Sequence, residues 1–183
     1  MELHFNFLES ATRAVIVDQI EACLTAEKIE QTQATLAAAG MPDRDQRDFE
    51  EVCETLDDLA VSDAVKADAR AVYDILAHAE AHVHQMPVMH THFHEVGRAA
   101  GVRNVVYICL LLEVLAPERI IATRVQTGSG KVHCAHGLMD IPAPATAAII
   151  ATGIPVCDQT LEGELLTPTS AALIKHFVDA FEE

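Results

Sequence analysis

Apolar and polar residues alternate along the first half of the chain with the period of helices. Apolar positions recur every three or four residues over Val15–Leu24 and Val65–Val83, which predicts two amphipathic helices. A further helix should run toward Ala39, because residues 40–42 (Gly-Met-Pro) form a stop signal. Residues 43–58 are dense in Asp, Glu and Arg, which favours a solvated helix face or a surface linker.

Capping and breaking residues suggest where these helices begin and end. Ser10 is suited to cap the first helix, and Ser62 or Asp63 the long one. Pro87 forbids continuation of the long helix. Asn104 is suited to cap a strongly apolar helix that ends at residue 115, before Pro117.

Strand patterns occupy the start of the chain and its second half. Leu3–Leu8 alternates as a strand does, and Ile154–Cys157 reads as a short strand. Ile120–Gln126 and Lys131–Ala135 are predicted to pair as a β-hairpin across a turn at residues 128–130 (Gly-Ser-Gly).

Two further helices complete the predicted order of elements. Pro142 and Pro144 suit a helix entrance and Gly153 its exit, and a last helix is expected over Thr167–Phe181. The predicted fold is therefore mixed α/β (α+β): one helix-rich domain over residues 1–183, with a small mixed sheet that includes a β-hairpin.

Charge and composition exclude several classes of function. A net charge of −16 argues against nucleic acid and anionic membranes as partners, because both require clustered Lys and Arg. The longest apolar run, Val105–Leu112, is too short to cross a bilayer, and the first residues lack the pattern of a signal peptide. The five cysteines form no CxxC pair. We expect a soluble, cytoplasmic protein without a disulfide framework.

Three histidines at alternate positions form the strongest chemical signal. If the run His90-Thr-His92-Phe-His94 is extended, the three imidazoles share one face, with Glu95 beside them. Imidazoles and a carboxylate are suitable ligands for nickel or zinc. Isolated histidines more often lie at the surface or in a satisfied core, but three in alternation favour metal binding.

A second cluster adds a thiol to this ligand set. His133, Cys134 and His136 follow one another on a predicted strand and turn, and a thiolate beside imidazoles suits nickel or zinc. The alternative is a small buried thiol flanked by edge histidines. His78 and His82 are four residues apart on the long helix, and exposure without a ligand is the favoured interpretation there.

Two other motifs have simpler explanations. Residues 128–131 (Gly-Ser-Gly-Lys) lack the first glycine and the final Ser or Thr of a phosphate-binding loop, so a turn is the better account. Residues 167–170 (Thr-Pro-Thr-Ser) at a helix start could hold an anion on free backbone N–H groups or could be ordinary capping, and the sequence does not decide.

From about Leu56 to its end, the chain resembles the N-terminal region of the LarC-type nickel-insertion protein of lactate-racemase maturation. Residues 1–55 match it poorly. The motifs that carry the resemblance occur in the same order in both, namely Ala77–His84, His92–Gly97, Gly128–Gly130, Cys134–Gly137, Ile141–Thr146, Leu161–Glu164 and Thr167–Thr169.

The resemblance implies a specific chemistry. Members of this family place nickel into a pyridinium bis-thiocarboxylate mononucleotide to make the nickel-pincer nucleotide, a lyase-type chelatase reaction coupled to CTP hydrolysis in a separate C-terminal domain. The implied metal-handling residues are His92, His94, His133, Cys134 and His136. The implied catalytic carboxylates are Glu95 and Glu164, and Thr167 and Thr169 are the implied residues for binding the nucleotide.

Departures from the family pattern limit what is carried over. Ala100 and Asn104 stand where the family has acidic residues, so hard oxygen ligands are fewer here. The CTP-binding domain has no counterpart in these residues. We therefore expect CTP not to bind this chain alone. The chain either acts with a separate CTP-binding subunit or delivers metal without one, and the question of a homo-oligomer stays open.

Three hypotheses follow from the sequence. The leading one is a shortened, stand-alone nickel-binding relative of the insertion protein, with the metal ion and a nucleotide precursor as its small-molecule partners. The second is a non-catalytic, degenerate homologue that acts as a binding or regulatory module, motivated by the missing acidic positions. The third and weakest is a small zinc-dependent hydrolase that uses Glu95 as general base.

Overall fold

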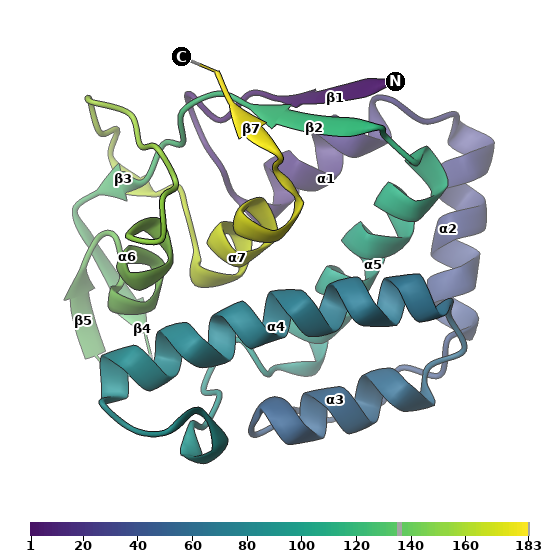
Figure 1. Cartoon of the computed structure of the whole chain (residues 1–183), viewed down its shortest axis with the longest axis horizontal. Helices are drawn as coiled ribbons and strands as arrows, with labels where there is room; N and C mark the ends of the chain where they lie inside the picture. Colours follow the sequence, from purple (N-terminus) through teal and green to yellow (C-terminus); the bar gives the residue numbers. More distant parts are fainter. Residues whose placement is uncertain (135–136, 183) are drawn as a thin grey trace.

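The computed structural model describes residues 1–134 and 137–182. Helices make up most of the regular structure (Figure 1). They are α1 (Arg13–Glu21), α2 (Ala26–Ala38), α3 (Phe49–Asp58), α4 (Asp63–His84), η1 (Val88–His90, a 3₁₀ turn), α5 (Ala99–Leu115), α6 (Pro144–Ile150) and α7 (Pro168–Phe177). The strands are β1 (Glu2–Phe5), β2 (Arg119–Ala122), β3 (Gly128–Ser129), β4 (Lys131–Cys134), β5 (Gly137–Asp140), β6 (Gly163–Glu164) and β7 (Ala180–Phe181).

A parallel sheet of β1, β2 and β7 joins the start, middle and end of the described chain. Strand β2 is central, with Leu3 opposite Ile120 on one side and Ile121 opposite Ala180 on the other. Leu3 and Ile120 point into the core, so one face of the sheet packs on the helices. The helices all lie on that side of the sheet in Figure 1.

The outer face of the sheet is covered by charged side chains. His4 lies 3.5 Å from a carboxylate oxygen of Glu182, and Arg119 lies 3.8 Å from one of Glu2. Polar residues at these alternate positions explain how a short parallel sheet leaves one face to solvent.

Helix α4 is the central packing element of the helical layer. It contacts α3, α5, α6 and α7 and crosses the molecule in Figure 1. Its apolar stripe, which includes Val65, Val72 and Leu76, is fully or almost fully buried. The hydroxyl of Ser62 accepts a hydrogen bond from the Val65 N–H at 3.1 Å, so the predicted cap is confirmed.

The mixed α/β class and the presence of a β-hairpin are confirmed, but the predicted pairing of the hairpin is wrong. Strand β2 pairs in parallel with β1 and β7, whereas β4 pairs with β5 in the antiparallel ladder that joins Lys131 to Asp140. Gly128 and Ser129, predicted as a turn, form β3 and pair with β6. Alternation identifies a strand but carries no information on its partner, which long-range packing decides.

The start of α5 also differs from the prediction. Asn104 lies inside the helix, which begins five residues earlier with Arg98 as its cap residue. The Asp45 carboxylate accepts a hydrogen bond from the Ala99 N–H at 2.9 Å and satisfies one of the free donors of the first turn. Because the capping residue lies 54 residues away in the sequence, the residues next to Ala99 do not reveal where α5 begins.

Several smaller predictions need correction. Thr12, not Ser10, precedes α1 in extended geometry, and residues 154–157 contribute only an isolated bridge between Val156 and Val125. The last helix ends at Phe177 because the chain turns back to form β7. Of the two alternatives for residues 43–58, the linker is wrong and the helix with a solvated face is confirmed, since α3 buries Val52 and Leu56 and exposes most of its acidic side chains.

None of the helices in the described part of the chain is long and apolar enough to span a membrane.

Candidate functional site

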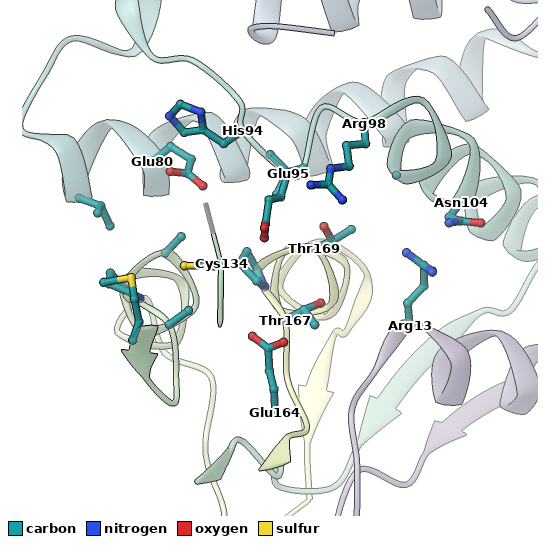
Figure 2. A pocket seen from close by; sticks show the side chains of 18 of the residues that line it. Arg13, Glu80, His94, Glu95, Arg98, Asn104, Cys134, Glu164, Thr167 and Thr169 are labelled. Carbon is teal, nitrogen blue, oxygen red and sulfur yellow. The ribbon is translucent and has the colours of Figure 1, made fainter. Parts of the chain in front are cut away.

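A cavity of about 400 Å³ lies where α4, α5, α6 and α7 meet the small strands (Figure 2). This size is within the range of small-ligand sites. Six of the nine site residues implied by the family resemblance line it, and they come from four separate segments. They are His94, Glu95, Cys134, Glu164, Thr167 and Thr169.

The loop that carries His94 and Glu95 into the cavity is not an extended strand. His90 closes the 3₁₀ turn η1, in which its N–H donates to the Pro87 carbonyl at 2.9 Å. His92 pairs with Asp48 in an isolated bridge. The expectation that three histidines share one extended face is therefore wrong, because the chain forms a 3₁₀ turn directly after Pro87 instead of a strand.

Backbone hydrogen bonds fix this loop to the acidic segment before α3. The Phe93 N–H donates to the Arg47 carbonyl at 2.6 Å, and the Gln46 N–H donates to the Gly97 carbonyl at 2.7 Å. Between these two contacts, the buried hydroxyl of Tyr73 donates to the Val96 carbonyl at 2.8 Å. The loop is thus held on both sides of His94 and Glu95.

Gly97 makes the close approach of the two segments feasible. A Cβ atom at this position would lie 2.0 Å from the Gln46 carbonyl oxygen and 2.8 Å from the Cβ of Phe93. Both distances are far below van der Waals contact, so only glycine fits without displacing the backbone.

Two carboxylates face each other across the middle of the cavity. Figure 2 shows Glu95 pointing down from the loop and Glu164 pointing up from β6. Burial, followed by the negative charge of Glu95, raises the pKa of Glu164 above its usual range. A cation bound between the two carboxylates would remove this penalty, and without a cation Glu164 is a stronger base than an ordinary glutamate.

Sulfur and imidazole groups lie toward one end of the cavity. Cys134 on β4, Glu80 on α4 and His94 are on the same side in Figure 2. The His84 and His94 rings are 6.2 Å apart between centroids, and the His84 Nε2 atom lies 3.5 Å from a Glu80 oxygen. Among residues 1–134 and 137–182, however, no three His, Cys, Asp or Glu side chains form a complete metal site.

The remaining predicted ligands lie elsewhere. His92 is exposed and does not line the cavity. His133 is exposed on β4, and because it precedes Cys134 it points to the opposite face of that strand. His136 lies outside the described residues. The structure thus brings His94 and Cys134 to one cavity and leaves His92 and His133 out of it, which does not favour the predicted role of these two residues as ligands.

The side chain of Thr167 caps the start of α7. The Thr167 hydroxyl accepts a hydrogen bond from the Ser170 N–H at 3.3 Å and lies 2.9 Å from the Ser170 hydroxyl. Thr167 therefore caps the helix and also contributes to the cavity wall.

Sequence reasoning missed three charged residues of this cavity. Arg13 and Arg98 lie on the side away from Cys134 in Figure 2, and Glu80 lies on the same side as Cys134. Glu80 falls between His78 and His82 in a motif that was recognised, so it could have been singled out. Arg13 belongs to no motif that was singled out in the sequence, and only the fold brings it to the site.

Comparison with known proteins identifies the family. A family model described as "Nickel insertion protein" matches residues 2–183. The pyridinium-3,5-bisthiocarboxylic acid mononucleotide nickel insertion protein of Staphylococcus epidermidis is 37% identical over 135 residues, covering 74% of this chain and 34% of the relative. The protein of the same name from Thermotoga petrophila is 41% identical over 122 residues, covering 66% of this chain and 30% of the relative.

The chain spans about a third of the length of these curated relatives. No solved structure is similar enough to count as a match. The match over residues 2–183 shows that the chain belongs to the nickel insertion protein family.

Proposed function

We propose that this chain binds nickel in the cavity and passes it to a sulfur-bearing pyridinium mononucleotide, the compound named in its relatives. The convergence of His94, Glu95, Cys134 and Glu164 on one cavity carries the proposal. A thiolate and an imidazole suit nickel, and the thiocarboxylates of the nucleotide offer sulfur ligands of the same kind.

An incomplete protein ligand set fits a transfer reaction. The described residues supply fewer than three clustered ligands, so the nucleotide would complete the coordination of the metal and then retain it. We assign Cys134 and His94 to nickel, and Glu95 and Glu164 to charge compensation and to the acceptance of protons that the metal displaces. Glu164 suits this role while the cavity is free of metal, because burial and the charge of Glu95 raise its pKa.

Thr167 and Thr169 are assigned to the nucleotide, because their side chains line the cavity next to Glu164. CTP hydrolysis is assigned to a separate CTP-binding subunit or domain, and the proposal does not require CTP to bind these residues.

A non-catalytic binding module is the second candidate. It is favoured by the absence of a three-ligand metal group within the described residues. A catalytic zinc site normally has three protein ligands, so the same observation gives no support to a zinc hydrolase.

Calorimetric titration with Ni²⁺ at pH 7.5, without nucleotide, tests the proposal. Cys134→Ser and His94→Ala should each weaken nickel binding by about tenfold or more, because each removes a direct ligand. His92→Ala and His133→Ala are matched controls from the same two motifs and should bind as the unaltered chain does. Equal nickel affinity in all four variants would refute the assignment, and no nickel binding by the unaltered chain would favour the non-catalytic module.

A further inference from the structure

Two arginines of the cavity have no protein partner for their charge. Arg13 begins α1 and Arg98 precedes α5, and both side chains line the cavity. Neither one forms a hydrogen bond or an ion pair through its side chain with any residue that the structure describes.

Arg44 and Arg103 have no such partner among the described residues either, but they do not line the cavity. By contrast, Arg47, Arg70 and Arg124 are each held by a carboxylate, namely Glu51, Asp57 and Asp158. Glu95 also lines the cavity near Arg98 and still forms no ion pair with it. The two guanidinium groups are therefore available to a ligand.

We propose that Arg13 and Arg98 form the phosphate-binding end of the cavity. The inference rests on the proposed function, which makes the ligand a mononucleotide. A nucleotide phosphate carries close to two negative charges at neutral pH, and guanidinium groups bind phosphate through paired N–H donors. These are the arginines of the cavity, and they lie away from Cys134 (Figure 2).

The two arginines lie at one end of the cavity and Cys134 lies toward the other, and this arrangement defines how the nucleotide would lie. With its phosphate at Arg13 and Arg98, the pyridinium ring extends toward Glu95 and Glu164, and its sulfur substituents approach Cys134. Arginine is suited to this role because its guanidinium group keeps its charge at all working pH values and offers five N–H donors.

The test separates phosphate from the rest of the ligand. Nicotinic acid mononucleotide and nicotinic acid riboside share a pyridinium ring and a ribose and differ only in the phosphate. Their affinities for the chain would be measured by calorimetry with a chelator present and no nickel added. The variants are Arg13→Gln and Arg98→Gln, with Arg103→Gln as the matched control, because Arg103 is exposed on α5 and does not line the cavity.

We expect the unaltered chain and Arg103→Gln to bind the mononucleotide at least about tenfold more tightly than the riboside. Each cavity variant should lose most of that preference and leave the riboside affinity within about twofold. Equal preference in all three variants, or an equal loss for both ligands, overturns the phosphate assignment.

The result also distinguishes this inference from the proposed function. Binding of both ligands without dependence on either arginine overturns the phosphate assignment alone. Failure to bind either ligand overturns the phosphate assignment and also removes the nucleotide from the proposed function.

Discussion

Replacing Tyr73 with Phe tests whether the loop before α5 depends on its buried hydrogen bond. Tyr73 is fully buried, and its hydroxyl donates to the Val96 carbonyl at 2.8 Å. Burial raises the pKa of Tyr73, so the hydroxyl stays a donor at any working pH. The substitution keeps the ring and removes only the donor.

The expected loss is that of a buried acceptor left without its partner, about 1–3 kcal/mol. For a chain of this length each kcal/mol lowers the melting temperature by about 2–4 °C, so a fall of roughly 4–8 °C is expected at the middle of that range. Thermal unfolding followed by circular dichroism measures it.

The only other tyrosine is the matched control. The Tyr107 hydroxyl donates to a Glu21 oxygen at 2.6 Å in a partly exposed position, where water can replace it. Tyr107→Phe should change stability by no more than about 0.5 kcal/mol. Equal melting temperatures for the two variants would refute the reasoning, and the loop would then be held by its other contacts alone.

Two further predictions concern the same loop and the carboxylate pair. Gly97→Ala should cost about 1–3 kcal/mol in urea unfolding, because the new methyl group must displace the Gln46 backbone, and an unchanged midpoint would show that the two segments separate easily. Glu164→Gln should stabilise the metal-free chain at pH 7. The raised pKa of Glu164 means that the folded state binds more protons than the unfolded one, so the stability of the unaltered chain falls as the pH rises from the ordinary carboxyl pKa through the raised value. The advantage of the variant should disappear at about pH 4, and an advantage that persists in acid would contradict the assigned cause.

Local signals predicted the helices best. Ser62 caps α4, and α2 ends before Gly40, as their sequences indicate. The start of α5 could not be predicted, because its cap comes from Asp45, and the pairing of β2 could not be predicted because both of its partners lie more than 50 residues away. Propensity and periodicity describe a segment, whereas partners follow from the packing of the whole chain.

The candidate site also contains residues that the sequence identifies and residues that only the fold brings together. His94, Cys134 and Glu164 could be singled out by their chemistry, and the fold brings them to one cavity. That His133 points away from this cavity could be expected from the alternation along β4 only once Cys134 was known to face it. Arg13 gave no signal, because it stands alone in the sequence, far from the other residues of the cavity.

The way in which residues 46–47 hold the loop has a consequence for how freely this region can vary. The contacts to Phe93 and Gly97 use main-chain atoms of Gln46 and Arg47, which every amino acid except proline can supply. The Arg47 side chain is exposed, so it can be exchanged without loosening the loop. Gln46 differs, because its side chain is buried and its amide donates to the Arg44 carbonyl at 2.8 Å. Mutational tolerance should therefore be wide at Arg47, narrower at Gln46 and almost absent at Gly97.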